Sequence, residues 1–386
     1  MISIDATALN AQRTGTVTYL IEILRHINAD ESFDYYFIVF VTMNNQHHFE
    51  ALELDHRFEL SIAPAGKLGR LVWQQTAMIW KIWRKKVAAH WGPTFVLPWY
   101  SPCPCVVTVH DMTFELYPQA HERLKRLYFP VMIRLAVSRA RTVLAVSFNT
   151  AKDLARLIPA CQSKTRVTRL AATMFIEGKV RAQAPEKPLS QSPTLPFVQP
   201  PFILSVGTIE PRKNLPRLVA AWQRLSDDER QGHRLLIVGA AGWLVHDWQT
   251  TVEQDDSVVF AGHLSDQQLQ ASLQGATAFV YPSLYEGFGL PVLEAMAYGV
   301  PVLTSRVGAT LEVAGTAALL VDPQSVDEIR AALANLLTDG SLRARLAQAG
   351  LARAAQFSWQ ETTALTMAAI EEAIASAQRP PSATVR

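Results

Sequence analysis

Cysteine is scarce in this sequence, and its cysteines do not have metal-binding spacing. Only three occur, Cys103, Cys105 and Cys161, and no two of them form a C-x-x-C pair. Three thiols placed in this way cannot supply the disulfide framework of a small secreted domain or the ligands of a structural zinc site. We therefore expect a protein of a reducing compartment, the cytoplasm.

An excess of one charge is also absent, as is any long apolar run. Lys and Arg number 36 against 34 Asp and Glu, so the net charge of +2 gives no support to a nucleic-acid partner. No apolar run of about 18 residues occurs, which argues against a membrane-spanning helix. The first residues, Met1–Asp5, lack the basic and apolar regions of a signal peptide, so we expect no secretion signal.

Two motifs of nucleotide-using enzymes are missing as well. No G-x-G-x-x-G follows the first expected strand, where the loop holds the single glycine Gly15, so the dinucleotide-binding fingerprint is excluded. No Asp-x-Asp pair is present to hold a divalent metal ion. We expect a site that works without a metal or a cofactor.

The length and the order of the segments predict two domains. A chain of 386 residues with 49% hydrophobic content can form two packed cores. Strand-length apolar runs alternate with helical segments in both halves, which predicts an α/β protein with two doubly wound parallel sheets. Six prolines over 183–201 predict a linker between a domain over 1–182 and a domain over 202–358. We expect a disordered tail over 378–386.

The segment Tyr285-Glu-Gly-Phe-Gly-Leu-Pro-Val-Leu-Glu294 carries the strongest functional signal. An apolar run before it predicts a strand over 278–281, and Pro291 is a favoured first residue for the helix that follows. The glycines let a ligand approach the backbone, and the helix N-terminus offers N–H groups to an anion. Carboxylates at Glu286 and Glu294 flank this anion site. The arrangement suits a ligand with phosphate in the middle and hydroxyl groups at both ends, which describes a nucleotide-sugar.

This spacing of two glutamates around Phe-Gly resembles the family 4 retaining glycosyltransferases, which have the GT-B fold. The resemblance implies two Rossmann-like domains with a cleft between them, an acceptor-side domain first and a donor domain second, with a final helix over 359–377 crossing back to the first. It implies that Glu286 contacts the hydroxyl groups of the donor sugar. The implied donor-binding residues of the loop and helix are Gly287, Phe288, Gly289, Leu290 and Glu294. The alternative is a capped helix with solvated carboxylates.

A second loop of the donor domain carries two adjacent cations. A strand over 202–206 ends at Gly207, and Thr208-Ile-Glu-Pro-Arg-Lys-Asn214 follows it, with Asn214 expected to cap the next helix. Arg212 can bond two phosphate oxygens at once and Lys213 supplies a point charge, so the pair suits a diphosphate. The family has Arg and Lys in this loop, which implies a catalytic role for both. The alternative is a solvated charged turn.

Six further residues gain a role from the resemblance. His110 follows a strand over 105–109, at the end where open α/β sheets bind ligands, and the family has a histidine there beside the donor sugar. Gly15 matches a family glycine near the donor diphosphate, although an ordinary helix start explains it nearly as well. Backbone groups of the loop formed by Gly262, His263 and Leu264 are expected to hold the base, and Gly207, at the end of the strand over 202–206, is expected to bind the donor.

The segment 68–87 allows two interpretations. It combines Trp73, Trp80 and Trp83 with four cations near its end. It could be a helix lying on an anionic membrane or an interior helix with a solvated last turn, and we favour the interior helix. The face expected to pack holds Leu68, Leu71, Val72, Gln75, Ile79, Ile82 and Trp83.

Together these patterns predict a retaining, metal-independent hexosyltransferase. A His-Gly-Pro-type loop over 89–98 and the stretch Glu210-Pro-Arg-Lys-Asn214 resemble mannosyltransferases of surface-polysaccharide and O-antigen synthesis, which favours GDP-mannose as the donor. A glycan or lipid-linked glycan is the expected acceptor, and contact with the inner face of the cell membrane is compatible with it. The alternatives are a UDP-sugar donor, a nucleotide-sugar epimerase or hydrolase, and a non-catalytic subunit of a polysaccharide-assembly complex.

Overall fold

Parallel strands form two separate sheets, one in each of two units. The computed structural model describes residues 1–121, 123–173, 201–240, 242 and 255–378. Unit 1 is formed by Met1–Glu115, Arg123–Leu170 and the described part of the segment that begins at Ser358. Unit 2 is formed by the described residues of Leu116–Glu122 and Ala171–Phe357. The predicted linker over 183–201 lies outside the described residues except for Pro201, as does the predicted tail except for Gln378.

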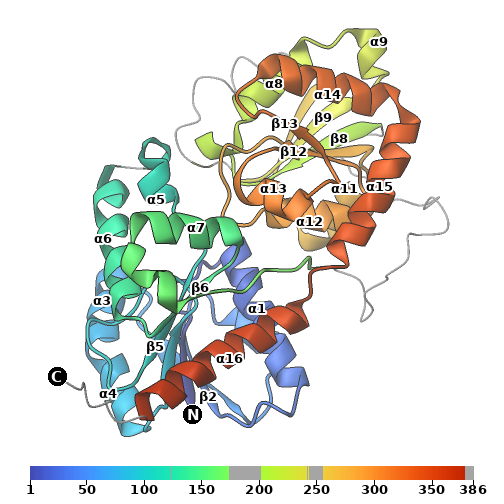
Figure 1. Cartoon of the computed structure of the whole chain (residues 1–386). Helices are drawn as coiled ribbons and strands as arrows, with labels where there is room; N and C mark the ends of the chain where they lie inside the picture. The colour runs from blue at the N-terminus through green and yellow to red at the C-terminus, as the bar shows by residue number, and fades with distance from the viewer. Residues whose placement is uncertain (122, 174–200, 241, 243–254, 379–386) are drawn as a thin grey trace. The chain divides into compact units, whose positions relative to one another are not determined.

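Unit 1 is a seven-stranded sheet in which helices join the successive strands, except that a loop joins β4 to β5 (Figure 1). The strand order is β3-β2-β1-β4-β5-β6-β7, and every pair is parallel. Its elements are β1 (Ile2–Asp5), α1 (Gly15–Ala29), β2 (Phe37–Thr42), α2 (His47–Glu50), β3 (Phe58–Ala63), α3 (Lys67–Gln75), α4 (Ala77–Arg84), β4 (Ala89–Gly92), β5 (Cys105–Val109), α5 (Thr113–Leu116), α6 (Arg123–Arg139), β6 (Thr142–Ala145), α7 (Phe148–Leu157), β7 (Thr165–Val167) and α16 (Trp359–Gln378).

Unit 2 is a six-stranded sheet of order β10-β9-β8-β11-β12-β13, again with every pair parallel. Its elements are β8 (Phe202–Val206), the 3₁₀ turn η3 (Pro211–Lys213), α8 (Leu215–Gln223), α9 (Asp227–Arg230), β9 (Arg234–Val238), β10 (Val258–Gly262), α11 (Asp266–Gly275), β11 (Ala278–Tyr281), α12 (Leu290–Ala297), β12 (Val302–Ser305), α13 (Gly308–Ala314), β13 (Leu319–Val321), α14 (Val326–Thr338) and α15 (Gly340–Ala354). The two parallel, doubly wound sheets confirm the predicted α/β fold class.

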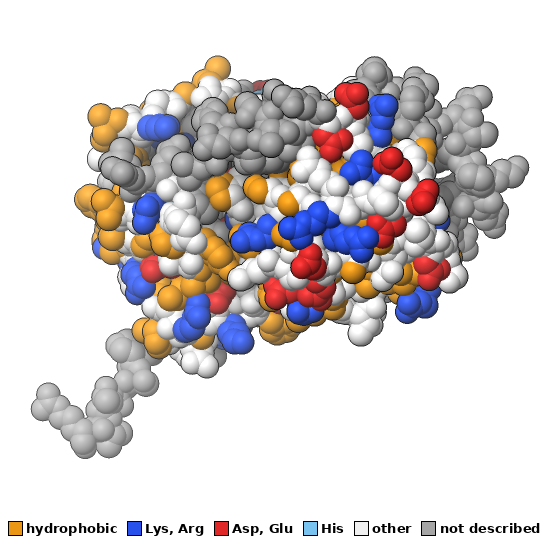
Figure 2. Space-filling model, turned by 90° about the horizontal axis from the view of Figure 1, so that it is seen from above, with side chains coloured by type: hydrophobic (Ala, Val, Ile, Leu, Met, Phe, Trp, Pro, Cys, Tyr) orange, Lys and Arg blue, Asp and Glu red, His pale blue; other side chains and the backbone are white. Residues whose placement is uncertain are grey.

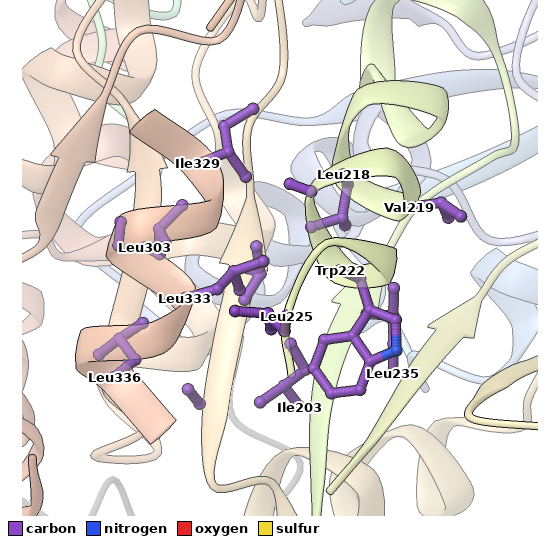
Figure 3. Packing of buried hydrophobic residues seen from close by; sticks show 14 of the residues in the cluster. Ile203, Leu218, Val219, Trp222, Leu225, Leu235, Leu303, Ile329, Leu333 and Leu336 are labelled. Carbon is purple, nitrogen blue, oxygen red and sulfur yellow. The ribbon is translucent and has the colours of Figure 1, made fainter. Parts of the chain in front are cut away.

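The core of unit 2 lies between the sheet and the neighbouring helices α8 and α14. Figure 3 shows Trp222 of α8 packed among aliphatic side chains of the strands and of α14, including Ile203 and Leu333. The sequence predicts the buried face of α8 from its helical spacing, and all five predicted residues are buried: Leu215, Leu218, Val219 and Trp222 in α8, and Leu225 just after its end. Burial of this stripe fixes α8, and so fixes where the loop before it ends.

The last helix, α16, packs within unit 1 beside α1 (Figure 1). Its side chains bond to the far edge of the seven-stranded sheet, where Glu372 pairs with Arg166 at 2.8 Å and Ser376 accepts a hydrogen bond from Arg141 at 2.9 Å. The 20 residues of α16 cover almost the same range as the helix predicted over 359–377.

The segment 68–87 differs most from its prediction. It forms two helices that meet at Thr76, whose backbone leaves the helical region with φ −132° and ψ −85°. Trp73 packs on Phe40 at 5.4 Å between ring centres, whereas Trp83 is exposed. The predicted packing face is therefore wrong in part: Ile82 is buried, but Leu68 and Val72 before the break and Trp83 after it are exposed. Gln74 and Met78 occupy the inward side instead.

Three strands of unit 1 are absent from the predicted set: β3, β4 and β7. The strands β3 and β7 lie at the two edges of the sheet and are only partly buried, so their sequences lack a continuous apolar run. The strand β4 is fully buried, but its sequence is the short Ala-His-Trp-Gly, in which Ala and Gly are poor strand formers. Pairing with β1 and β5 decides its conformation.

Candidate active site

The charged residues predicted in unit 2 come together because two strands are neighbours. The strands β8 and β11 pair in parallel, so the loops after their carboxyl ends emerge at the same edge of the sheet. Arg212 and Lys213 lie in η3, after β8, and Glu286 lies in the loop after β11. The two loops are also bonded directly, since Leu284 N–H donates to the carbonyl oxygen of Arg212 at 2.8 Å.

Glu286 is the centre of this cluster. Its Oε1 accepts hydrogen bonds from Lys213 Nζ at 2.7 Å, Ser283 Oγ at 2.6 Å and Tyr281 OH at 2.9 Å. Its Oε2 accepts from a terminal guanidinium nitrogen of Arg212. The side chain of Glu286 is only 8% exposed, so its contacts with protein groups replace those it would make with water. Glu286 therefore fixes the positions of both cations.

Arg212 is held on two sides but remains partly open to solvent. Its Nε bonds to Glu210 Oε1 at 2.6 Å, and a terminal nitrogen donates to the carbonyl oxygen of Tyr285 at 3.3 Å. Its side chain is 20% exposed, compared with 9% for Lys213 and 5% for Glu210. An anion that approaches this edge can thus reach Arg212 with little rearrangement.

Burial and charge shift the pKa values of the cluster in linked ways. Burial alone would raise the pKa of Glu286, but the charges of Arg212 and Lys213 and the hydrogen bonds from its neighbours lower it to about 2. Burial lowers the pKa of Lys213, and repulsion from Arg212 lowers it further, against the attraction of Glu286 and Glu210. Burial, followed by the charge of Glu286, raises the pKa of the Tyr281 hydroxyl well above its usual value. Glu286 is therefore ionised at neutral pH and Tyr281 is neutral.

The glycine loop leads into α12 as predicted. Gly289 precedes the helix with φ +102°, a conformation that strongly favours glycine, and no side chain caps the first turn. Pro291 has no N–H and that of Val292 donates to the carbonyl oxygen of Gly289 at 3.0 Å, so the N–H of Leu290 is the group of this first turn that can meet an anion. Leu290 begins the helix, Gly287 and Phe288 are buried, and Phe288 lies edge-on to Phe357 at 5.9 Å.

Glu294 lies in α12, about one turn after Leu290, and is half-buried. Its contact with a ribose stays a prediction.

Three loops of unit 2 meet beside this cluster at close quarters. Gly207 N–H donates to Val238, and Gly239 N–H donates to the carbonyl oxygen of Gly262, at 2.9 and 2.8 Å. A Cβ atom at Gly239 would lie 2.0 Å from the carbonyl oxygen of Gly207, so only glycine fits there. His263 is exposed and Leu264 is buried. The loops expected to hold the base thus share one edge with Arg212 and Lys213.

The predicted residues of unit 1 also share a sheet edge. Gly15 is exposed and begins α1, which follows β1, and His110 comes directly after β5. Tyr19, one turn along α1 from Gly15, lies edge-on to His110 at 5.0 Å. The carboxyl ends of β1 and β5 therefore place Gly15 and His110 at the same edge of the seven-stranded sheet.

The hydrogen bond of His110 defines its tautomer. Its Nε2 lies 2.8 Å from the carbonyl oxygen of Pro93, and a carbonyl can only accept, so Nε2 carries the proton. Burial lowers the pKa of His110 although this hydrogen bond opposes the shift. A neutral ring with a proton on Nε2 carries its lone pair on Nδ1, which can accept a hydrogen bond from a hydroxyl group.

Sequence reasoning missed three residues of the cluster and misjudged one. Glu210, Tyr281 and Ser283 all hold its charged groups, but none was predicted as a site residue. A tyrosine and a serine at the end of a fully buried strand were the available signal. Asn214 occupies the residue before α8, but its side chain does not cap the helix: its oxygen accepts from Arg217 at 2.9 Å, and its amide nitrogen donates to the carbonyl oxygens of Pro282 and Pro323 at 2.9 and 2.6 Å. The predicted cap is therefore wrong, and Asn214 ties the two loops together.

Removal of the Tyr281 hydroxyl should destabilise the cluster measurably. A Tyr281→Phe variant loses the hydrogen bond to Glu286 and the acceptor for Lys213, and leaves a buried ammonium less well satisfied. We expect it to lower the free energy of unfolding by about 1–3 kcal/mol, as measured by urea unfolding. Tyr36→Phe, at a tyrosine that is exposed, is the control and should cost almost nothing. Equal losses in the two variants would show that the hydroxyl of Tyr281 does not support the cluster.

Within the described residues, no group of three His, Cys, Asp or Glu side chains is placed to hold a metal ion. The helices of that same part of the chain include none that is long and apolar enough to cross a bilayer.

Two family models match the sequence, one in each half. A model described as Glycosyltransferase Family 4 matches residues 13–169, and a model described as Glycosyl transferases group 1 matches residues 187–353. The second match contains every site residue predicted in unit 2, and the first contains Gly15 and His110.

Curated relatives and solved structures agree with these matches. O-antigen chain mannosyltransferase B of Escherichia coli is 33% identical over 294 residues, which are 75% of each chain. The serotype-specific mannosyltransferase WbdA of Escherichia coli is 28% identical over 303 residues, or 74% of this chain, but this chain spans only 35% of WbdA. A crystal structure of Anabaena HepE in complex with UDP and glucose has a TM-score of 0.73 and 17% identity, and the match covers 96% of this chain and 99% of HepE.

Proposed function

Because this chain belongs to glycosyltransferase family 4 and has its GT-B fold, we propose that it transfers mannose from GDP-mannose, with retention of configuration and without a metal ion. The proposed acceptor is a glycan or a lipid-linked glycan of surface-polysaccharide synthesis. Glycosyl transfer itself follows from the family. The choice of mannose is supported by the mannosyltransferases among its relatives.

The cluster around Glu286 is the observation that carries the proposal. Two cations, Arg212 and Lys213, stand at the carboxyl edge of the six-stranded sheet, in the same unit as the uncapped N-terminus of α12. Groups of this kind stabilise the charge that develops on a leaving diphosphate. In this proposal Arg212 and Lys213, each held by a carboxylate, take the place of a metal ion at the diphosphate.

The proposed reaction breaks the bond between the anomeric carbon of the sugar and the diphosphate oxygen, and the electron pair stays on that oxygen. Arg212 and Lys213 stabilise the negative charge that forms there. The acceptor hydroxyl oxygen bonds to the anomeric carbon from the face that the diphosphate leaves, and its proton passes to the departing phosphate oxygen. Same-face attack retains the configuration without a protein nucleophile.

Glu286 and His110 have supporting roles in this proposal. Glu286 keeps both cations in place, and because its oxygens already accept four hydrogen bonds from protein groups, contact with a sugar hydroxyl would be an additional one. His110 presents Nδ1 as an acceptor, so it would orient a sugar hydroxyl. Free thiols at all three cysteines suit a reducing compartment, and we propose that the enzyme acts in the cytoplasm, in contact with the inner face of the membrane that carries a lipid-linked acceptor.

A thermal-shift panel of GDP, UDP and their sugars tests the donor. A ligand present at about 100 times its dissociation constant adds roughly 2.7 kcal/mol to the stability of the form that binds it. We expect GDP and GDP-mannose to raise the melting temperature and UDP to have no effect. A higher melting temperature with UDP alone would mean that the donor is a UDP-sugar, and the enzyme class would stay the same. No shift with any nucleotide would favour a non-catalytic subunit, and release of free sugar without an acceptor would favour a hydrolase.

A further inference from the structure

Four large aromatic side chains of unit 1 are directed into solvent on one face. Trp80 and Trp83 of α4, and Trp99 and Tyr100 of the loop after β4, are each between 51 and 68% exposed. We call these four residues the aromatic face. Single exposed apolar residues are common on protein surfaces, but a group of this size marks an interaction site.

The members of the aromatic face form one continuous surface. Trp80, Trp83 and Tyr100 line a cavity of about 400 Å³, and Trp99 and Tyr100 line a second cavity of about 610 Å³ beside it. Two hydrogen bonds of the Trp99 backbone fix the loop that carries Trp99 and Tyr100. Trp99 N–H donates to the side-chain oxygen of Gln75 at 2.7 Å, and the carbonyl oxygen of Trp99 accepts from Arg139 Nε at 2.8 Å. The surface is therefore held in place and extends from α3 and α4 to the end of α6.

Packing explains why the tryptophans of α4 face outward. Met78 and Ile82 form the stripe of α4 that packs on the seven-stranded sheet, one turn apart, with Trp73 of α3 beside them. Trp80 and Trp83 form a second apolar stripe that the core does not use. A helix that only covers a core needs one apolar stripe, so the second stripe is available to a partner outside the chain.

Cations surround the aromatic face. Arg84, Lys85 and Lys86 follow Trp83 directly, and Arg139 lines the second cavity. The guanidinium group of Arg84 lies over the ring of Trp80, 5.0 Å from its centre. Figure 2, which views the molecule from above, shows hydrophobic side chains mixed with Lys and Arg on its left side; α4, drawn at the bottom of Figure 1, lies on the far side of that view. The partner of this surface should therefore be both apolar and negatively charged.

We propose that the aromatic face and its cations dock on an anionic lipid bilayer. This proposal rests on the membrane contact in the proposed function, because it assigns that contact to a surface of the protein and to a lipid charge. Tryptophan and tyrosine rings prefer the level of the lipid headgroups, and Lys and Arg beside them bind anionic lipids. A glycan chain would also stack on exposed rings. Two observations favour lipid: Arg84 covers the ring of Trp80, and the exposed residues next to the face, Leu68 and Val72 of α3, are aliphatic.

The position of the face suits the delivery of a lipid-linked acceptor. The helix α3 begins after the carboxyl end of β3, and α4 ends before the amino end of β4, so the surface runs along the length of the seven-stranded sheet. At the α3 end, Arg70 donates to the carbonyl oxygen of Thr7 in the loop after β1 at 2.9 Å. That loop leaves the same sheet edge as His110. An acceptor whose lipid stays in the bilayer can therefore reach the edge that carries His110.

Flotation of the whole chain with lipid vesicles tests the proposal. The vesicles contain phosphatidylcholine alone or phosphatidylcholine mixed with anionic phosphatidylglycerol. We expect binding to the anionic vesicles only. Two double variants, Trp80→Ser with Trp83→Ser and Arg84→Gln with Lys86→Asn, should each weaken it by at least about tenfold. Asparagine suits position 86 because the backbone there has φ +51°. Tyr36→Ser and Arg156→Gln, at exposed positions elsewhere in unit 1, are the matched controls and should bind like the unchanged chain.

The outcomes separate this proposal from the proposed function. The double variants should keep their melting temperatures and their transfer rate to a soluble acceptor, because none of the changed residues belongs to the site around Glu286. Absence of binding to anionic vesicles, or equal binding by variants and controls, would overturn the docking surface while leaving glycosyl transfer intact. Binding of a soluble mannan through Trp80 and Trp83 without vesicle binding would assign the face to a glycan instead. If the chain binds vesicles but shows no transfer activity, the docking surface is supported and the proposed glycosyl transfer is rejected.

Discussion

An Arg212→Ala variant should lose about 10²- to 10³-fold in kcat/KM for glycosyl transfer, the usual effect of removing one preorganised group that stabilises transition-state charge. Glu210 and Glu286 hold the guanidinium group in place before any ligand binds, and one-fifth of the side chain is open to solvent. Glu286 keeps its bonds to Lys213, Tyr281 and Ser283 in the variant, so the protein should stay folded. Steady-state kinetics with the donor found in the thermal-shift panel give the measurement.

Two further variants make the result specific to Arg212. Arg212→Lys keeps a charge but loses the planar, two-pronged geometry, so its activity should fall between those of Arg212→Ala and the unchanged enzyme. Arg224→Ala removes an arginine at the end of α8 whose side chain is 57% exposed and pairs only at the surface with Asp327. It should have normal activity. Unchanged turnover in Arg212→Ala would reject the role of this residue at the diphosphate.

A Glu286→Gln variant should lose about 3–5 kcal/mol of stability, the cost of removing one partner from a buried ion pair. The glutamine keeps the size of the side chain but leaves Lys213 buried without its ion-pair partner. Urea unfolding at neutral pH measures the loss. Glu328→Gln removes a carboxylate of similar type from an ion pair with Arg306 in which both side chains are more than one-third exposed, and should cost about 0–1 kcal/mol.

The same variant should change the acid response of the protein. The pKa of Glu286 is about 2 in the folded protein, below its ordinary value of 4.5, so the unfolded chain binds the proton first as the pH falls. Stability that Glu286 contributes is therefore complete above about pH 5 and is lost between about pH 5 and pH 2. Unfolding measured over this window should depend less on pH in Glu286→Gln than in the unchanged protein. An identical pH dependence would contradict the charge balance described for the cluster.

Removal of both charges provides an internal check. In a Lys213→Met, Glu286→Gln double variant, the buried ammonium is gone, so part of the stability lost in Glu286→Gln should return. Activity should not return, because the diphosphate has lost Lys213. Additive losses in the double variant would mean that the two residues do not act as a pair.

Several features of this protein follow from local sequence. Alternation of apolar runs and helical stripes predicts the two parallel sheets, because side-chain periodicity reflects burial on one face of an element. The stripe from Leu215 to Leu225 is buried in α8 and just after its end. Glycine and proline at positions 289 and 291 predict the loop and the start of α12 within one residue, since both act on their own backbone angles.

The tertiary structure decided which groups meet. Glu286 lies 73 positions from Lys213 and 74 from Arg212, and only the parallel pairing of β8 with β11 brings their loops together. No local pattern shows that Glu210 and Tyr281 hold these cations, or that Asn214 bonds to two distant carbonyl groups instead of its own helix. The outward position of Trp80 and Trp83 has the same origin. Periodicity defines the stripes of a helix, but contacts with the rest of the sheet determine which stripe is buried, and those contacts join residues far apart in the sequence.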